Sequence, residues 1–510
     1  MVRSMAGCKG VVASLLMVVL LTVPMTALAG ELTAGDVDDN LQFSYYLEYL
    51  AHTLQNNTRV PKLEVHDRVI LKVVDGDGLP VSHALISVSV AGAPEPLIES
   101  YTNTAGVFYF FPEHDGAGQS RQFVAVARPP ARNASSAFVG FDLGQLDSGR
   151  TVLLRIPDYK TEQPLSLDIV FTIDVTGSMS DELKYLTSEF RSIIGDITAG
   201  FPKVSMRFGL VVYRDHGDEF VVRSYNFTDS LQKMQDQLAA QNANGGGDYE
   251  EAVDEALARA VEYPWREGNT VRMLFHVGDA PPHDELLSET LKPVEKARRQ
   301  GIQMFTLAGS GVADTAEYMM RAEALLTTGR YCFLTDDSGI GGSHEKPHIC
   351  CYVVTYLDEL IYRIVASELA GHRFEPNQTQ IIRTVGNYTN GTCGEEECSG
   401  NGTTGTPAPS LTPVSGGTSS GSSGYDGSSS GGSPSSDPSM AFAFGSRPTP
   451  SPSLTATEGG ERSGDATSPP PAKEKASVHS TPGMTGPAAG AAVAMVIGLK
   501  LLAGRLRKKD

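Results

Sequence analysis

The sequence is poor in several features that mark particular classes of protein. Its 510 residues include one tryptophan and six cysteines, and these cysteines are too few for a scaffold built from disulfides. Basic residues are also scarce, because 41 Lys+Arg stand against 60 Asp+Glu and the formal net charge is −19. A protein that coats nucleic acid needs a basic face to neutralise phosphate, so we expect no nucleic-acid partner. The phosphate-binding pattern G-x-x-x-x-G-K-[ST] is absent as well.

Glycine and proline, by contrast, are abundant, at 53 and 30 residues. Much of this excess lies in residues 399–482, which consist mainly of Ser, Gly, Thr and Pro. Such a stretch buries too little apolar surface to offset the backbone entropy lost on folding. We predict a disordered stalk there, which holds the folded part of the chain away from a membrane.

The two ends of the chain predict where the protein is located. Residues 1–29 combine a short basic start, an uncharged apolar stretch and the small-residue site Ala27-Leu28-Ala29. This order predicts a secretory signal peptide rather than an uncleaved anchor. Residues 483–510 hold a second apolar run, which Lys500 interrupts before a cationic end. We predict a transmembrane helix whose basic end stays inside the cell, with a buried soluble helix as the alternative.

The C-terminal segment also resembles a known kind of processing signal. Pro482-Gly483-Met484, an apolar run and a basic end follow one another in the order of the C-terminal sorting signals of archaeal surface proteins. The resemblance implies that the helix is either retained as an anchor or removed when a lipid is attached.

Seven N-x-[ST] sequons fit an exterior location. They predict a glycoprotein, with three of the sequons crowded at the start of the stalk. The candidate asparagines are Asn56, Asn133, Asn226, Asn377, Asn387, Asn390 and Asn401.

Residues 30–65 form an N-terminal segment in which one amphipathic helix is expected, because apolar residues from Phe43 to Leu54 recur at helical spacing. An acidic cluster, Asp36, Asp38 and Asp39, precedes them. We interpret the cluster as the acidic start of the helix rather than as a calcium loop. A calcium loop of the EF-hand type would need a bidentate glutamate downstream, and none follows at that spacing.

Residues 66–158 predict a small β-sandwich, because short apolar runs alternate with turn signals such as Asp75-Gly76-Asp77-Gly78. The order D-G-x-P-V-x-x-A-x-x-x-V, followed by T-N-x-x-G-V-F-Y-F-x-P, resembles the carboxypeptidase-regulatory-like, immunoglobulin-type modules of surface proteins. The resemblance implies a spacer or scaffold and no chemistry.

Residues 164–371 change to alternating strands and helices. Apolar strands are expected at 167–173, 206–213, 271–277, 302–307 and 331–334. Helices are expected at 181–197, 250–261, 291–299, 313–327 and 353–369. Strands that are apolar throughout and alternate with helices indicate an α/β doubly wound parallel sheet, covered on both faces. Ligands of such sheets bind at the carboxyl ends of the strands.

Three loops at those strand ends carry oxygen ligands. Asp174, Thr176 and Ser178 follow the first strand, Asp248 lies in a glycine-rich loop before a helix, and Asp279 follows a later strand. Carboxylates and hydroxyls are hard donors, which suit Mg²⁺, Ca²⁺ or Mn²⁺ better than zinc. A strand-end aspartate also caps helices, but three converging loops favour a metal.

These loops resemble the metal-ion-dependent adhesion site of the von Willebrand factor A domain. That site uses D-x-S-x-S, a threonine in a second loop and an aspartate in a third. The resemblance implies that Asp174, Thr176, Ser178 and Asp279 hold the metal, whereas Asp248 stands where threonine is expected. An extra carboxylate makes the site more anionic, which reduces its need for a carboxylate from a partner.

Two polar histidines, His216 and His283, are expected in loops near the same sheet edge. We interpret them as solvated rather than as ligands.

Residues 372–398 form an extension that contains cysteines. We expect disulfides there, because cysteines outside the cell oxidise in pairs. Cys393 is expected to close a small loop with Cys398, and Cys332 to pair with Cys350 or Cys351.

The sequence therefore predicts a secreted protein anchored at the cell surface. Its metal site would bind an extracellular protein or matrix ligand, and we expect no enzymatic activity. A metal-dependent hydrolase that uses the same carboxylates, or a purely structural component of the cell envelope, is the alternative.

Overall fold

The computed structural model describes residues 32–131, 134–339 and 343–394. Several predicted features lie outside the described residues: the signal peptide, the stalk, the C-terminal segment, Asn133, Asn401 and Cys398. Within the described part of the chain, none of the helices combines the length and apolar character needed to cross a membrane. The C-terminal anchor therefore stays a prediction.

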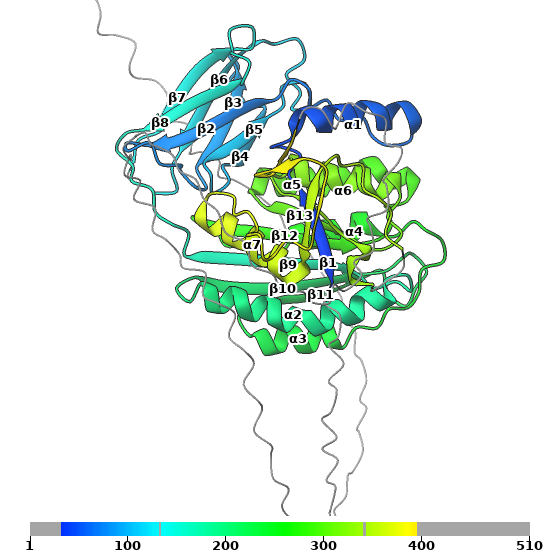
Figure 1. The fold of residues 1–510 in the computed structure, drawn as a ribbon. Helices are drawn as coiled ribbons and strands as arrows, with labels where there is room; N and C mark the ends of the chain where they lie inside the picture. Colours follow the sequence, from blue (N-terminus) through cyan, green and yellow to red (C-terminus); the bar gives the residue numbers. More distant parts are fainter. Residues whose placement is uncertain (1–31, 132–133, 340–342, 395–510) are drawn as a thin grey trace, which may run out of the picture. The chain divides into compact units, whose positions relative to one another are not determined.

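A nine-stranded sheet forms the centre of the described fold, in the order β11-β10-β9-β12-β13-β14-β1-β15-β16 (Figure 1). The strands β10, β9, β12, β13 and β14 run parallel to one another, as predicted. They are almost wholly buried because helices cover both faces, which explains why their sequences are mainly apolar. Their bounds are Ser166–Asp174 for β9, Ser205–Tyr213 for β10, Thr270–Gly278 for β12, Gln303–Ala308 for β13 and Tyr331–Leu334 for β14.

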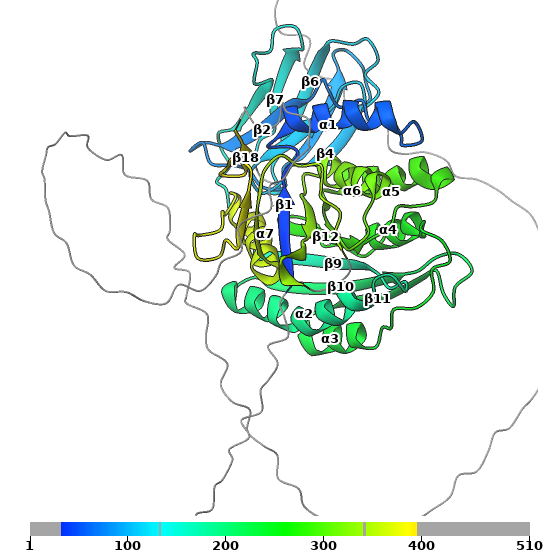
Figure 2. The same cartoon turned by 45° about the vertical axis from the view of Figure 1, so that its right-hand side comes forward.

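The prediction of an all-parallel sheet is wrong at three places, so the sheet is mixed. The edge strand β11 (Val222–Thr228) pairs antiparallel with β10, and β16 (Arg383–Val385) pairs antiparallel with β15 (Tyr352–Tyr356). Strand β1 (Thr33–Val37) lies inside the sheet, antiparallel to both β14 and β15. Figure 1 and Figure 2 show this blue strand among the green and yellow ones.

Strand β1 was not expected because its sequence, Thr-Ala-Gly-Asp-Val, contains an aspartate and a glycine. The structure accommodates both residues. A side chain on Gly35 would meet the Phe333 ring at 2.7 Å, so only glycine allows the two strands to approach. The Asp36 carboxylate is buried and pairs with Arg373 at 3.2 Å and Arg330 at 3.5 Å. The acidic residues at 36 and 39 are therefore neither a helix start nor a calcium loop, since Asp39 also forms a buried pair, with a helix arginine 2.7 Å away.

Helices cover the two faces of the sheet. One hydrophobic cluster joins the sheet to α2 (Ser180–Gly200), α3 (Leu231–Ala239) and α7 (Leu357–Ala370). A second cluster joins the other face to α4 (Val253–Val261), α5 (Leu287–Gln300), α6 (Asp314–Leu326) and α1 (Phe43–Asn56). Figure 1 shows α2 and α3 below the sheet and α5 and α6 above it. The expected helix at 353–369 is shorter because its first residues belong to β15.

Residues 69–156 form two smaller sheets around one hydrophobic cluster. One has the order β5-β2-β8 and the other β4-β3-β6-β7. Neighbouring strands are antiparallel except for the parallel pair β2 and β8. The bounds are Val69–Asp75, Leu85–Val90, Ile98–Tyr101, Val107–Phe110, Gln122–Arg128, Ala137–Asp142 and Thr151–Ile156 for β2 to β8. The immunoglobulin-type resemblance of this segment stays a prediction.

A buried ion pair joins this β module to α5. Arg298 on the helix contacts Asp115 at 2.6 Å, and both side chains are 2% exposed. His114 contacts Glu295 on the same helix at 2.6 Å. These contacts hold the module against the helical face of the large sheet.

The disulfide pairing differs from the prediction. Cys351 is bonded to Cys393, across a sequence separation of 42 residues, so Cys393 does not close the expected loop with Cys398. Cys332 is a buried free thiol on β14, so its predicted pairing with Cys350 or Cys351 is wrong. The bond links the segment before β15 to the short hairpin of β17 (Tyr388–Thr389) and β18 (Thr392–Cys393).

Candidate metal centre

Asp174 and Asp279 stand at the carboxyl ends of two neighbouring strands. Asp174 is the last residue of β9, and Asp279 directly follows β12. The order of the first six strands of the sheet is 3-2-1-4-5-6, counted along the chain from β9. The strand order reverses between β9 and β12, and in open α/β sheets this switch point is where ligands bind. The sheet topology thus brings together two loops that are about a hundred residues apart in the sequence.

The loop after β9 holds Asp174 in one orientation. The backbone amide and the hydroxyl of Thr176 both donate to Asp174 Oδ1, at 2.8 and 2.7 Å. The Thr176 hydroxyl also lies 3.2 Å from the hydroxyl of Ser178. Asp174 and Thr176 are buried, whereas Ser178 is exposed. The hydroxyls of Thr176 and Ser178 therefore lie between the buried Asp174 carboxylate and the protein surface.

Three buried carboxylates at this edge each keep an oxygen atom without a hydrogen-bond partner. These atoms are Asp174 Oδ2, Asp279 Oδ1 and Glu251 Oε2. Buried polar atoms in proteins are normally paired, and a bound ion or water is one explanation for a buried oxygen that has no partner in the protein. The donor set of this cluster, carboxylates with the hydroxyls of Thr176 and Ser178, fits a hard divalent ion.

Two glycines leave room around these side chains. A side chain on Gly278 would lie 2.6 Å from the Tyr213 hydroxyl and 3.6 Å from Asp174 Oδ2. A side chain on Gly246 would lie 3.0 Å from Glu251 Oε1 and 3.4 Å from Thr176 Cβ. Gly246 also has a φ of 75°, which favours glycine. The glycine-rich loop therefore brings its backbone close to both the carboxylate and the hydroxyl.

Burial and mutual repulsion shift the pKa values of the three carboxyls. Burial, and then the charge of Asp279, raise the pKa of Asp174 to about 7. Burial raises the pKa of Asp279 to about 6, against a hydrogen bond from Ser178 that lowers it. Burial, followed by the charges of Asp174 and Asp215, raises the pKa of Glu251 to about 9. The cluster strongly disfavours its own negative charge, and a bound cation would relieve that cost.

The buried carboxylate of the glycine-rich loop is Glu251, which sequence reasoning missed. The backbone amide of Glu251 donates to the carbonyl of Pro281 at 3.0 Å, which ties the loop to the segment after β12. Asp248 is exposed. The signal that could have identified Glu251 is its place directly before α4, where the chain enters the buried layer. Asp248 as a ligand stays a prediction.

Comparison with known families agrees with this geometry. Residues 168–339 match the family model of the von Willebrand factor A domain. Residues 168–339 form a von Willebrand factor A domain. No curated protein matches the chain significantly.

Solved structures that resemble the chain include two of bacterial origin. The conserved hypothetical protein BatB from Bacteroides thetaiotaomicron is 12% identical, with 40% of this chain and 99% of BatB covered and a TM-score of 0.28. A von Willebrand factor type A protein from Catenulispora acidiphila is 13% identical, with 49% of this chain covered and a TM-score of 0.28. The match spans 46% of that protein, which is less than half of its length.

Two histidines that were expected to be solvated lie close together beside the carboxylate cluster. His283 Nε2 contacts Asp215 Oδ1 at 2.7 Å, and the His283 side chain is 19% exposed. The ring of His216 lies 5.6 Å from the ring of His283. The interpretation of both histidines as solvated is therefore wrong for His283.

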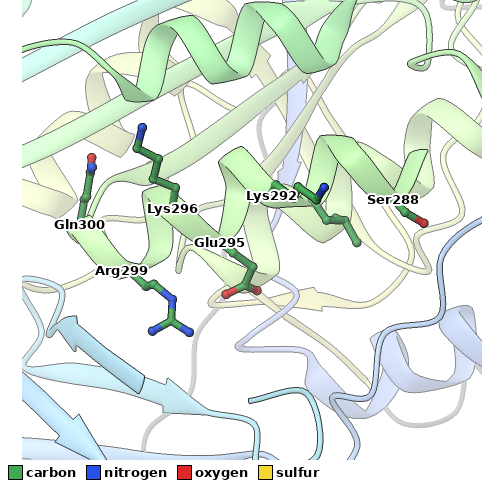
Figure 3. A pocket seen from close by; sticks show the side chains of 7 residues that line it. Ser288, Lys292, Glu295, Lys296, Arg299 and Gln300 are labelled. Atoms are coloured by element: carbon green, nitrogen blue, oxygen red, sulfur yellow. The ribbon is translucent and has the colours of Figure 1, made fainter. Parts of the chain in front are cut away.

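A hollow of about 500 Å³ lies elsewhere on the same domain, along α5 (Figure 3). Its lining residues all belong to that one helix, and it includes none of the buried carboxylates. The lining consists of Ser288, Leu291, Lys292, Glu295, Lys296, Arg299 and Gln300. An open surface lined by long, flexible side chains is a poorer site than the strand-end cluster, so we place the function at the cluster.

The chain also contains an H-E-x-x-H sequence, His344 to His348. In zinc proteases both histidines of this motif face one metal from a helix. Here the segment is not helical, and Pro347 lies within it. His344 contacts Asp336 at 2.8 Å, whereas His348 contacts Glu317 at 3.0 Å. The two histidines have different partners, so the segment is not a zinc-protease site.

Proposed function

We propose that the von Willebrand factor A domain holds one divalent cation, Mg²⁺ or Ca²⁺, and uses it to bind an extracellular protein or matrix ligand. The ligand set would consist of the carboxylates of Asp174, Glu251 and Asp279 with the hydroxyls of Thr176 and Ser178. The observation that carries this proposal is the group of three buried carboxylates whose unpartnered oxygens share one edge of the sheet.

Each of these residues would have a separate part in binding. Thr176 holds one oxygen of Asp174 through two hydrogen bonds, which leaves the other oxygen for a cation. The Ser178 hydroxyl is exposed and would lie on the side from which a ligand approaches. When bound, the cation supplies a Lewis-acidic position that can accept an oxygen atom of a partner.

The charge of the site predicts what kind of oxygen the partner offers. Three ionised carboxylates around a divalent ion leave the site with one net negative charge. A carboxylate from the partner would add to that charge, so a neutral oxygen donor, such as a carbonyl, amide or hydroxyl group, is favoured. The sequence-based inference that an extra carboxylate reduces the need for an acidic partner would then apply to Glu251 in the place of Asp248.

The location that we propose is the cell surface, with the folded part outside and the chain tethered by residues 483–510. The signal peptide predicted at residues 1–29 and the stalk predicted at residues 399–482 support this location. A disulfide between Cys351 and Cys393 supports it further, because disulfides persist in oxidising compartments. The five described sequons, Asn56, Asn226, Asn377, Asn387 and Asn390, are all exposed, as glycosylation requires.

We also propose that the protein is a binding protein and not an enzyme. A hydrolase would need a general base within reach of a metal-bound water. The three carboxylates at the site would themselves be ligands, which leaves none of them free for proton transfer.

The proposal can be tested with the full chain and an isosteric variant. Calorimetry with Mg²⁺ and Ca²⁺ should show one bound ion in the wild type and none in Asp174→Asn. Immobilised wild-type protein should retain envelope proteins with Mg²⁺ or Ca²⁺ and release them with EDTA, while Asp174→Asn retains none. The control is Asp181→Asn, which removes an exposed carboxylate seven residues downstream, in the first turn of α2. Ion binding and retention that survive in Asp174→Asn would refute the proposal.

A further inference from the structure

Two loops at the same sheet edge bring a second set of metal-binding side chains together. Asp215 and His216 follow β10, and His283 follows β12. One ligand atom from each residue lies within 4.8 Å of the other two. Asp215 is buried, His283 is half-buried and His216 is exposed, so the group opens to solvent on one side.

Backbone contacts that do not involve the three side chains hold both loops, and after β12 the Pro281 carbonyl accepts a hydrogen bond from the Glu251 amide at 3.0 Å. Asp218 accepts hydrogen bonds from the backbone amides of Asp215, at 3.3 Å, and of Gly246, at 2.9 Å. A side chain on Gly245 would lie 2.2 Å from the Asp218 carboxylate, so the glycine-rich loop fits closely against this carboxylate. Because the backbone is held in place, the ligands need little reorganisation to receive an ion.

The chemistry of this group differs from that of the carboxylate cluster. It offers two imidazole nitrogens and one carboxylate, whereas the cluster offers oxygen atoms alone. Imidazole with carboxylate is a donor set that suits zinc and related transition metals. Three protein ligands with an open position are also the usual set of a zinc site that keeps a water or an exogenous ligand.

We propose that Asp215, His216 and His283 form a second metal site, which binds a transition-metal ion of the zinc type. The side chain of Glu255 lies 3.8 Å from His216 Nδ1 and stands beside the open side of the group. The inference does not depend on the proposed function, because it uses none of the residues that would hold Mg²⁺ or Ca²⁺.

The two sites are nevertheless neighbours. Glu251 lies in the electrostatic field of both Asp174 and Asp215. A zinc ion at the second site would therefore place positive charge beside the first, and the two occupancies should influence each other.

One other group of possible metal ligands lies among the described residues: Glu64, His66 and Glu113. It has a single imidazole, and His66 is 61% exposed while Glu113 is 49% exposed. Exposed acidic groups of this kind bind ions weakly, because solvated side chains lose entropy when they are ordered. This group is therefore the matched control for the histidine pair.

The test uses the full chain and Zn²⁺ as the probe, with Mg²⁺ present in excess. Calorimetry should show one Zn²⁺ bound per chain, and Co²⁺ in its place should give the visible absorption of an imidazole-ligated ion. Removing a residue that only supports a metal ligand typically weakens metal binding by ~10–100-fold. Removing a ligand itself should weaken Zn²⁺ binding at least as much. We expect this in both His283→Gln and His216→Gln, and His216 is exposed enough that its variant should fold.

The controls separate this site from the other two. Zn²⁺ affinity should be retained in His66→Gln, which removes the competing imidazole, and in Asp174→Asn, which removes the proposed Mg²⁺ site. The inference is overturned if the double variant of His216 and His283 binds Zn²⁺ as tightly as the wild type. It is also overturned if Zn²⁺ binding is lost in His66→Gln or in Asp174→Asn.

Discussion

Replacing Asp174 by asparagine removes one negative charge from the buried carboxylate cluster and keeps the shape of the side chain. The asparagine oxygen can still accept the two hydrogen bonds from Thr176. Its amide group can donate to the neighbouring carboxylates, which have unpartnered oxygens. We therefore expect a folded protein that is more stable than the wild type without metal and insensitive to added metal.

The expected gain in the free energy of unfolding follows from the pKa of Asp174. Its value in the folded chain is about 7, against an ordinary value of 3.8. Each pKa unit corresponds to about 1.4 kcal/mol, so ionising this carboxyl in the folded protein costs ~4 kcal/mol more than in the unfolded chain. Because neighbouring groups relax, we expect Asp174→Asn to raise the free energy of unfolding by ~2–4 kcal/mol at pH 8 in EDTA.

The difference in stability between wild type and Asp174→Asn should depend on pH. A carboxyl whose pKa is raised on folding binds more protons in the folded state, so its contribution to stability is lost as the pH rises from 3.8 to about 7. At pH 4 the carboxyl is protonated in the folded state and only partly ionised in the unfolded chain, so the advantage of the variant should be small. The difference between wild type and variant should therefore grow between pH 4 and pH 8.

The assay is urea unfolding of both proteins at pH 4 and pH 8, with EDTA and then with Mg²⁺ or Ca²⁺. A metal at a hundred times its dissociation constant stabilises the folded wild type by ~2.7 kcal/mol. The same metal should leave Asp174→Asn unchanged. If wild type and variant unfold at the same urea concentration at pH 8 in EDTA, and respond equally to metal, the reasoning about the cluster is refuted.

Three further changes test other parts of the structure. Glu251→Gln should weaken Mg²⁺ or Ca²⁺ binding ~10-fold or more in calorimetry, whereas Asp248→Asn should leave it nearly unchanged; the reverse order would restore the sequence-based ligand. Replacing both Cys351 and Cys393 by serine should lower the free energy of unfolding by ~2–4 kcal/mol, and equal stability of the reduced and oxidised wild type would contradict this. Asp115→Asn leaves the buried arginine of α5 without its charged partner and should cost ~3–5 kcal/mol; a loss below ~1 kcal/mol in urea unfolding would show that the pair does not hold the β module in place.

Much of the domain could be predicted from local patterns. The strands β9, β10, β12, β13 and β14 are mainly apolar because both of their faces are buried, and this shows directly in the sequence. Asp174 and Asp279 were placed at one edge because parallel strands end at the same edge of a sheet. Neither inference needed to know which distant segments come into contact.

Other features depend on contacts between segments that are distant in the sequence. Local sequence patterns do not reveal such contacts. Strand β1 pairs with β14 about three hundred residues away, and its aspartate is tolerated only because arginines from elsewhere neutralise it. The partner of Cys351 and the approach of His283 to Asp215 likewise depend on long-range contacts.

The sequence by itself thus determined the alternation of buried strands and helices, and the position of Asp174 and Asp279 at strand ends. Both follow from the spacing of apolar residues along the chain, which reflects burial and helical periodicity. Only the tertiary structure showed that the Glu251 carboxylate is buried with Asp174 and Asp279, while Asp248 is exposed. The physical reason is that both residues lie in one loop with the same chemistry, and only the contact of that loop with the segment after β12 turns one carboxylate inward and leaves the other in solvent.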